Sequence, residues 1–262
     1  MTKYVLPRER FSALANALGE GPDRVISIAR LQRRQCRAYV LGDPEHFEAA
    51  IVQEDLASEE PAGYGRSAAA LWKLLQTVPD WSCINVATEI APELGQIIQA
   101  AKGGTTADDN IRYYGDVYYS LTEPLATMPA HAALTAGTVR RLTANDRPLL
   151  INAPEAIKEY LGDLRELITE CGVAAVIVQG TIVAIAQVYA ESKEYADVGV
   201  FTLEDWRCHG LATAAAAVLI QGIQAANKIP AWSTGEDNLA SMKVAEKLGF
   251  AERGRRTYVI PL

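Results

Sequence analysis

The sequence predicts an α/β (α+β) fold built around a mixed sheet. Strand-type and helix-type segments alternate along the chain of 262 residues. A β-branched run at 198–202 passes through a polar turn into an apolar segment at 211–226, whose apolar residues recur at helical spacing. Two further strand-type runs, at 174–178 and 182–189, flank Gln179-Gly180 and are typical of an antiparallel hairpin. A strand–helix crossover beside a hairpin favours a sheet with both parallel and antiparallel pairs.

The first half begins with a helix from Arg8 to Leu18, which the Gly- and Pro-containing segment 19–22 ends. The arginines of 30–37 have two interpretations, a phosphate-binding patch and a solvated basic face. A polar, acidic loop is expected at 54–62. The other expected elements are strands at 38–41 and 47–53, a helix at 67–77, a strand at 82–86, a helix at 92–101 and a tyrosine-rich strand at 111–121.

In the second half, Thr143 can cap a helix that has Asp146 in its first turn. Pro154 suits the first position of a helix that extends to about Thr169. Gly249 is placed to end a later helix. The expected elements are a strand at 139–142, these first two helices, the hairpin, a strand at 195–202, the helix at 211–226, a strand at 231–233, a helix at 238–248 and a closing strand at 251–260.

The loop that precedes the helix at 211–226 holds the pattern Arg207-x-x-Gly210-x-Ala212. The first backbone N–H groups of a helix have no partner within the helix and carry about half a positive charge. Gly210 and Ala212 place no large side chain in front of these groups, and Arg207 adds a formal charge. The loop therefore predicts a pyrophosphate site. The alternative is a strand–helix crossover in which the Gly and the Arg serve only the turn.

This loop resembles the Arg/Gln-x-x-Gly-x-Gly/Ala fingerprint of the GNAT superfamily of acyl-CoA N-acyltransferases. A second stretch is similar to the family's next motif, Asn238-x-x-Ser241-x-x-Val244-Ala245-x-Lys247-Leu248-Gly249-Phe250. The resemblance covers about 138–262 and implies the GNAT fold, with acetyl-CoA as the co-substrate. The expected order of strands and helices agrees with that fold. The family's usual final strand is missing after Leu262 or is supplied elsewhere.

The resemblance also implies which residues form the site. Those implied to bind the cofactor are Val200, Phe201, Thr202, Arg207, Cys208, His209, Gly210, Leu211, Ala212, Asn238 and Ser241. The family often places the catalytic base on the strand before the loop, and Asp197 is the carboxylate there. The alternative for Asp197 is a solvated carboxylate at a strand edge. Glu204 is a weaker candidate for the base.

The general acid of many relatives is a Tyr in the last helix, and its position here is occupied by Ala245. Ser241 is a candidate to donate a hydrogen bond to the sulfur; the alternatives are contact with pantetheine or simple packing. Asn238 would contact pantetheine and can also cap its helix. Cys208 and His209 also permit chemistry at a nucleophilic cysteine. In the GNAT interpretation these two residues supply only backbone amides.

Two parts of the chain share a weak internal similarity. Residues 65–71 can be laid on residues 210–216, and the same order of helix, strand, helix and long strand follows in both. The first copy lacks the Arg-x-x-Gly-x-Ala pattern. We therefore interpret 1–125 as a degenerate GNAT-like domain, 126–137 as a linker and 138–262 as a GNAT N-acetyltransferase domain. The alternative is chance similarity between Ala-rich helices.

Composition excludes several classes of protein. The net charge of -7 gives no support for nucleic-acid binding, and no apolar run reaches the ~18 residues of a membrane span. The first residues lack the apolar core of a signal peptide. The four cysteines form no Cys-x-x-Cys pair and only three histidines are present, which argues against a metal site. Reduced thiols favour a cytoplasmic location.

The sequence therefore predicts an N-acetyltransferase that moves an acetyl group from acetyl-CoA to a primary amine of a small molecule or amino acid. The amine would attack the thioester directly in a ternary complex, with most of the acceleration coming from positioning and from polarisation of the carbonyl. The alternative is a catalytically weak acyl-CoA-binding sensor or regulatory module. We expect a small-molecule amine as partner, no nucleic acid, membrane or metal, and either a monomer that imitates a GNAT dimer or a homodimer.

Overall fold

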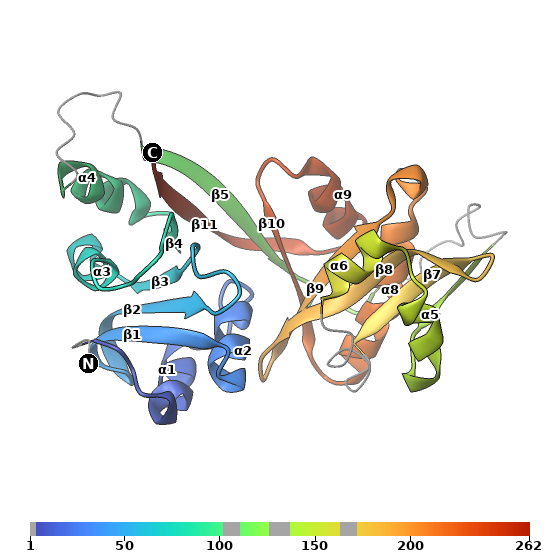
Figure 1. The fold of residues 1–262 in the computed structure, drawn as a ribbon, viewed down its shortest axis with the longest axis horizontal. Helices are drawn as coiled ribbons and strands as arrows, with labels where there is room; N and C mark the ends of the chain where they lie inside the picture. The colour runs from blue at the N-terminus through green and yellow to red at the C-terminus, as the bar shows by residue number, and fades with distance from the viewer. Residues whose placement is uncertain (1–3, 102–110, 126–136, 163–171) are drawn as a thin grey trace. The chain divides into compact units, whose positions relative to one another are not determined.

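The computed structural model describes residues 4–101, 111–125, 137–162 and 172–262 and divides into two compact units (Figure 1). Unit 1 comprises Met1–Tyr118, Ser233–Asn238 and Arg253–Leu262, and unit 2 comprises Tyr119–Trp232 and Leu239–Glu252. The expected linker at 126–137 lies almost entirely outside the described residues. The C-terminal segment, which the sequence places with the second half, packs within unit 1.

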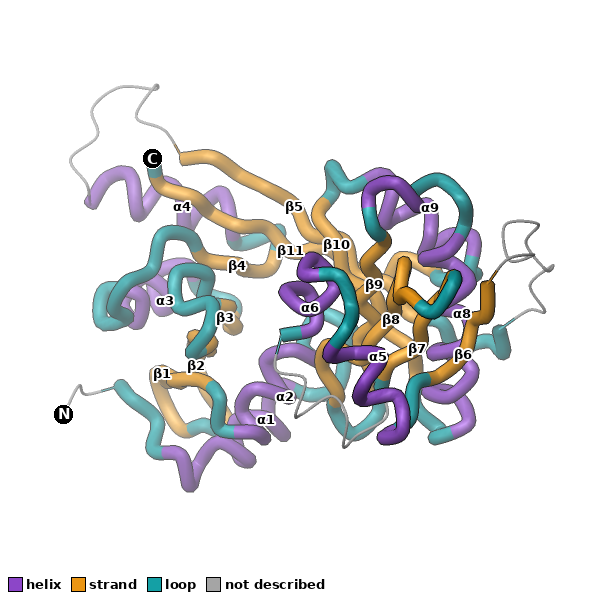
Figure 2. Tube along the Cα trace, turned by 45° about the vertical axis from the view of Figure 1, so that its right-hand side comes forward, coloured by secondary structure: helices purple, strands orange, loops and turns teal. Residues whose placement is uncertain are grey.

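Unit 1 is a sheet with two helices against each face (Figure 2). Its strands follow the order β1-β2-β3-β4-β11-β5. β3 and β4 are parallel, whereas β1–β2, β2–β3 and β4–β11 are antiparallel. Its elements are η1 (Arg8–Arg10), α1 (Phe11–Leu18), α2 (Val25–Arg33), β1 (Cys36–Asp43), β2 (His46–Glu54), β3 (Ala62–Gly65), α3 (Ala68–Leu75), β4 (Ile84–Ala87), α4 (Ala91–Ala101), β5 (Ile111–Ser120) and most of β11 (Ala251–Pro261).

Alternate residues of the first two strands enter two different cores. Tyr39 and Ile51 pack with α3 and α4, whereas Ala38 and Ala50, one position along each strand, pack with α1 and α2. Successive side chains of a strand point to opposite faces of the sheet. The nearly unbroken apolar runs of β1 and β2 are therefore explained by burial on both faces.

Two elements of unit 1 are absent from the sequence-based prediction. The helix α2 buries Val25, Ile28 and Leu31 on one face. Its two arginines, Arg30 and Arg33, lie outside this buried face. The strand β3 contains Gly63 and Gly65, which disfavour a strand on propensity alone. A Cβ on Gly63 would meet Ile84 Cδ1 at 3.0 Å, so close packing against β4 requires the glycine there. Tertiary packing decides both elements.

Unit 2 has its own sheet, in the order β10-β9-β8-β7-β6, with α5 and α6 against one face. β9 and β10 are parallel, and the other pairs are antiparallel. Its elements are β6 (Gly137–Arg141), η3 (Ala144–Asp146), α5 (Arg147–Ile151), α6 (Glu155–Leu161), β7 (Val173–Val178), β8 (Thr181–Glu191), β9 (Tyr195–Thr202), η4 (Glu204–Trp206), α8 (Leu211–Ala225), most of β10 (Ile229–Gly235) and α9 (Leu239–Lys247).

Local signals in the second half are confirmed. Gln179 and Gly180 both have positive φ, 49° and 79°, as the tight turn of the β7–β8 hairpin requires. Thr143 and Asp146 form a reciprocal capping box. A bidentate contact with Arg140 lowers the pKa of the Asp146 carboxyl. The expected helix at 154–169 is shorter than predicted: α6 ends at Leu161, where Gly162, with φ 69°, is its C-cap. Residues 163–169 lie outside the described part of the chain.

The two halves of the sequence repeat one order of elements, two helices, three strands, helix, strand, helix and strand, although most of the last strand, β11, packs within unit 1. α3 begins three residues after Gly65 and α8 begins one residue after Gly210, so laying 65–71 on 210–216 leaves the two helix starts two residues apart. In each copy the third strand of the three is parallel to the next strand. The predicted fold class, a mixed α/β sheet in a tandem arrangement, is confirmed. Among the helices that the structure describes, none combines the length and hydropathy needed to cross a bilayer.

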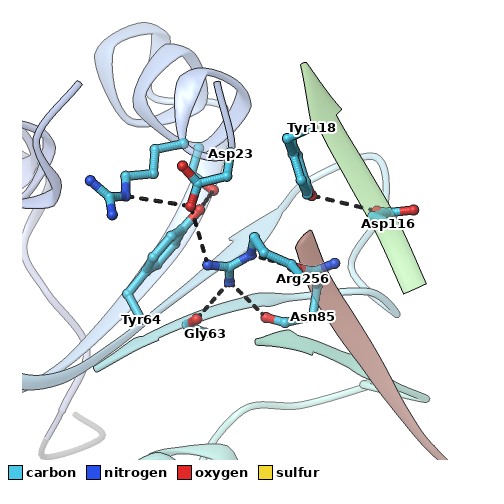
Figure 3. Close-up of polar contacts among 9 residues, drawn as sticks. Asp23, Gly63, Tyr64, Asn85, Asp116, Tyr118 and Arg256 are labelled. Atoms are coloured by element: carbon cyan, nitrogen blue, oxygen red, sulfur yellow. Dashed lines mark hydrogen bonds and ion pairs between the residues drawn. The ribbon is translucent and has the colours of Figure 1, made fainter. Parts of the chain in front are cut away.

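The C-terminal strand pairs with β4 and buries two side chains in unit 1, Val259 in the apolar core and Arg256 in a polar cluster (Figure 3). Arg256 Nε donates to Asn85 Oδ1 at 2.5 Å, and its Nη2 donates to the carbonyl oxygens of Gly63 at 2.7 Å and Asn85 at 3.0 Å. Its Nη1 lies 3.8 Å from Asp23 Oδ2, and the guanidinium lies 4.6 Å from the centre of the Tyr64 ring. Arg256 therefore links β3, β4 and β11 where the parallel β3–β4 pairing is very short.

We expect Arg256→Met to lower the free energy of unfolding by about 3 kcal/mol or more, because it leaves the oxygens of Gly63 and Asn85 buried without a donor. Urea denaturation followed by circular dichroism measures the change. Arg255→Met, at an exposed neighbouring position, is the matched control. Equal stability of the two variants would show that Arg256 is not a principal link of β11 to this sheet.

Candidate active site

The parallel strands β9 and β10 stay together for only three residue pairs. The pairs are Tyr195–Ile229, Ala196–Pro230 and Asp197–Ala231. β9 continues to Thr202 along β8 on its other side. Beyond Asp197, within the described residues, the edge of β9 that faces β10 has no sheet partner.

Alternate residues direct their backbone groups toward this unpaired edge. Leu203 N donates to Val183 O at 3.0 Å, on the β8 side. Because N–H and C=O groups alternate between the two neighbours along an antiparallel strand, Val200 and Thr202 face the unpaired side. The buried Oγ1 of Thr202 has no hydrogen-bond partner in the described part of the chain. Buried polar atoms are rarely left so, which marks this edge as a place for a ligand.

The loop after β9 is shaped by two residues with positive φ, Cys208 at 63° and Gly210 at 74°. Gly210 is the N-cap of α8 and makes no side-chain cap, so the first N–H groups of α8 point out of the helix end. Arg207 Nε donates to Thr202 O at 3.4 Å, which brings the guanidinium back to the end of β9. The unpaired edge thus leads directly to a loop suited to an anion.

Asp197 lies where β9 and β10 part. Its side chain is only 4% exposed, so the alternative of a solvated carboxylate is wrong. Opposite it, the register of β8 shifts between Val188 and Ala190, a bulge of the kind often found beside active sites. The assignment of Asp197 as the base stays a prediction. Glu204 is exposed in η4.

Ser241 on α9 has a structural partner. The buried Trp232 donates from Nε1 to Ser241 Oγ at 3.0 Å, and Trp232 packs on Phe250. Ala245 is fully buried, so the position of the family's Tyr offers no hydroxyl. Asn238 directly precedes α9 and is assigned to unit 1, where its N–H donates to Gly235 O at 3.0 Å. The predicted pantetheine contact of Asn238 is not tested by these contacts.

Three residues beside Asp197 were missed by sequence reasoning: Tyr160, Gln187 and Gly199. Gly199 pairs with Gln187 across β9 and β8, and Tyr160 of α6 lies over it. Burial, and then the charge of Asp197, raises the pKa of the Tyr160 hydroxyl, so it stays protonated at neutral pH. The available signal was Gly199 itself, because a glycine inside a β-branched strand marks a close approach.

Two of the described cysteines, Cys36 and Cys83, are buried and unsuited to nucleophilic chemistry. Burial raises the pKa of Cys36 to about 12 and that of Cys83 to about 11, so both thiols are protonated at neutral pH. Cys208 is exposed in the loop. Cys171 lies outside the described residues.

One group of possible metal ligands occurs at the β1–β2 turn. The ligand atoms of Asp43, Glu45 and His46 lie within 4.8 Å of one another, and all three residues are exposed. Glu45 N donates to Asp43 Oδ1 at 2.9 Å, so the turn itself already accounts for part of this cluster. We assign it no role.

Ser241→Ala tests the structural role of this serine. It leaves the buried Trp232 Nε1 without an acceptor, so we expect the free energy of unfolding to fall by about 1–3 kcal/mol. In a Trp232→Phe background the same change should matter much less. Chemical denaturation of the wild type, the two single variants and the double variant measures this coupling. Equal effects of Ser241→Ala in both backgrounds would show that the Trp232–Ser241 hydrogen bond does not stabilise the fold.

Comparison with known proteins identifies the second half. Residues 159–259 match the family model described as GNAT acetyltransferase. No curated protein matches the sequence.

The chain is also similar in fold to solved structures whose names describe GNAT proteins. A GCN5-related N-acetyltransferase-like protein from Streptococcus suis has 19% identity and a TM-score of 0.64, covering 96% of this chain and 98% of that one. An acetyltransferase from the GNAT family of Colwellia psychrerythraea has 15% identity and a TM-score of 0.61, covering 98% of each chain. A tandem GNAT protein from the clavulanic acid biosynthesis pathway has 13% identity and a TM-score of 0.56, covering 98% of this chain and 96% of that one. Residues 159–259 are therefore a GNAT acetyltransferase domain, in a chain that has the GNAT fold.

Proposed function

We propose that this protein is an N-acetyltransferase that moves an acetyl group from acetyl-CoA to a primary amine of a small molecule or amino acid. The observation that carries the proposal is the continuity of the unpaired edge of β9 with the Arg207-x-x-Gly210 loop. An extended donor can lie along the strand and place its phosphates at the helix end.

The fit of acetyl-CoA to these residues rests on three features. The backbone of Val200 and Thr202 is directed to the unpaired edge, and the buried Thr202 Oγ1 lacks a partner in the described chain. Gly210 allows close approach to the start of α8, and Arg207 supplies a positive charge. When bound, acetyl-CoA supplies a thioester as the acyl donor. The backbone of Val200 and Thr202 and the loop at Arg207 and Gly210 would hold the donor, with Asp197 on the same strand.

Asp197 is proposed as the base that takes the proton of the attacking amine, directly or through water. The nitrogen lone pair forms the new C–N bond, the C–S bond breaks, and the electron pair leaves on sulfur. Ala245 supplies no proton there, and CoA thiolate is a tolerable leaving group. We propose a small-molecule partner, and either a monomer or a homodimer as the active form.

A catalytically weak acyl-CoA sensor is the second candidate, and Ala245 is the observation that favours it. Thiol release from acetyl-CoA with lysine, tyramine, spermidine and glucosamine distinguishes the two. Amine-dependent release supports the enzyme. Tight CoA binding without release from any of the four amines supports the sensor.

Arg207→Ala should weaken binding of acetyl-CoA by about 1.5–3 kcal/mol, roughly 10- to 150-fold, because it removes a charged hydrogen bond to phosphate. Gly210→Glu should do at least as much damage, because position 210 needs positive φ and the new carboxylate repels phosphate. Calorimetry measures both. Arg147→Ala, at an exposed arginine of α5, is the control. Unchanged affinity in both loop variants would disprove the pyrophosphate assignment.

Asp197→Asn should lower the rate at neutral pH and leave CoA affinity nearly intact, because the amide cannot take the proton. The loss should shrink at high pH, where more of the amine is already neutral. The measurement is a pH–rate profile of thiol release, with Asp205→Asn in exposed η4 as the control. An Asp197→Asn variant with full activity and an unchanged profile would show that the base is another group.

A further inference from the structure

One face of β9 carries features that the proposed chemistry leaves unexplained. Side chains alternate along a strand, so Asp197, Gly199 and Phe201 share a face. Phe201 packs in the core formed by α5, α6 and the sheet, so this is the face toward α6. Gly199 sits between the proposed base and an aromatic ring, at the part of the strand that has left β10.

Gly199 makes room for one atom, the hydroxyl oxygen of Tyr160. A Cβ built on Gly199 would lie 2.5 Å from Tyr160 Oη, and the next atom of that side chain, Cζ, would be at 3.6 Å. Real Cβ atoms do not approach a neighbour to 2.5 Å, whereas 3.6 Å is ordinary contact. The glycine therefore serves the hydroxyl and not the ring. A glycine in a strand interior is otherwise unfavourable, since it has no side chain to pack.

The Tyr160 side chain is positioned by its ring, which stacks on Phe201 with centroids 5.2 Å apart and planes at 27°. The backbone of Tyr160 is held as well, because Gln187 Nε2, on a buried side chain, donates to the carbonyl oxygen of Tyr160 at 3.4 Å. Together these contacts place the hydroxyl over Gly199.

The hydroxyl lies close to Asp197. Residues i and i+2 of a strand are about 6.5–7 Å apart along the chain, and Tyr160 Oη lies directly over residue 199. The Asp197 charge acts on the hydroxyl strongly enough to be the second cause of its raised pKa, after burial. A cationic amine placed between Asp197 and Tyr160 would find a carboxylate and a neutral hydroxyl oxygen as acceptors.

We propose that Tyr160 is an acceptor-binding residue: its hydroxyl, which lies over Gly199, accepts a hydrogen bond from the amine whose proton Asp197 takes. The inference rests on the proposed function and adds to it a residue that binds the acceptor amine. α6 thereby contributes to specificity.

Tyr160→Phe removes the hydroxyl and keeps the ring on Phe201. We expect the KM for the amine to rise roughly 3- to 10-fold, the loss of one neutral hydrogen bond, with the affinity for CoA unchanged. The measurement is steady-state thiol release with the amine that works best among lysine, tyramine, spermidine and glucosamine. Tyr113→Phe, at an exposed tyrosine of β5, is the matched control.

Gly199→Ala provides a second variant, with a readout that a packing role would not produce. The added methyl displaces the hydroxyl, so the amine KM should rise as it does in Tyr160→Phe. In the Tyr160→Phe background the same methyl meets only the ring carbon, so Gly199→Ala should have little further effect on KM or on the melting temperature. This non-additivity is the signature of the contact.

The outcomes separate the two levels of the proposal. If wild-type protein binds CoA and acetylates an amine, but Tyr160→Phe and Gly199→Ala both keep its KM, the inference about Tyr160 is wrong and the proposed function stands. If additive effects replace the coupling, the hydroxyl does not occupy the place over Gly199 in solution and the inference is also wrong. If wild-type protein releases no thiol with any of the four amines, the proposed function is wrong, and the inference that Tyr160 binds the acceptor amine is wrong with it.

Discussion

The site depends on one constraint: two parallel strands, β9 and β10, that pair for three residues and then part. A parallel strand that loses its neighbour exposes backbone groups that must find other partners. Here β9 keeps β8 on its other side, so the strand stays straight and anchored while one edge becomes available. The same strand ends in the loop that opens α8, which aligns the unpaired edge with the positive end of a helix.

Unit 1 meets the same constraint in a different way. Its parallel pair, β3 and β4, meets only at Ala62 and Asn85. The oxygens of Gly63 and Asn85 accept from Arg256, a side chain of the chain's own last strand. The carbonyl groups that unit 2 leaves open beside its parallel pair are therefore satisfied internally in unit 1. The described strands of unit 1 therefore need no ligand at this point, and the Arg-x-x-Gly-x-Ala pattern is not found beside them.

The residues that break local rules gather along β9. Asp197 is a buried carboxylate, Gly199 is a glycine inside a strand, and Thr202 has a buried hydroxyl oxygen without a partner among the described residues. Each of these features lowers the free energy of unfolding unless other contacts compensate for it. Asp197 and Gly199 lie on the face of β9 that turns toward the apolar core with α5 and α6, and Thr202 lies on the opposite face. Departures from good packing that lie on one strand, surrounded by regular structure, are typical of a functional site.

The sequence by itself determined the local elements and the loop. The hairpin at Gln179-Gly180, the capping box at Thr143 and the Arg207-x-x-Gly210-x-Ala212 turn are set by short-range chemistry, because each depends on residues a few positions apart. Only the tertiary structure decided that Asp197 is buried, that Tyr160 lies over Gly199 and that Arg256 belongs to unit 1. These three depend on contacts between segments distant in the chain, for which strand spacing and helical periodicity carry no information. The glycines at 63 and 199 show the difference most directly: their identity is in the sequence, but the neighbours that require them are brought together only by the fold.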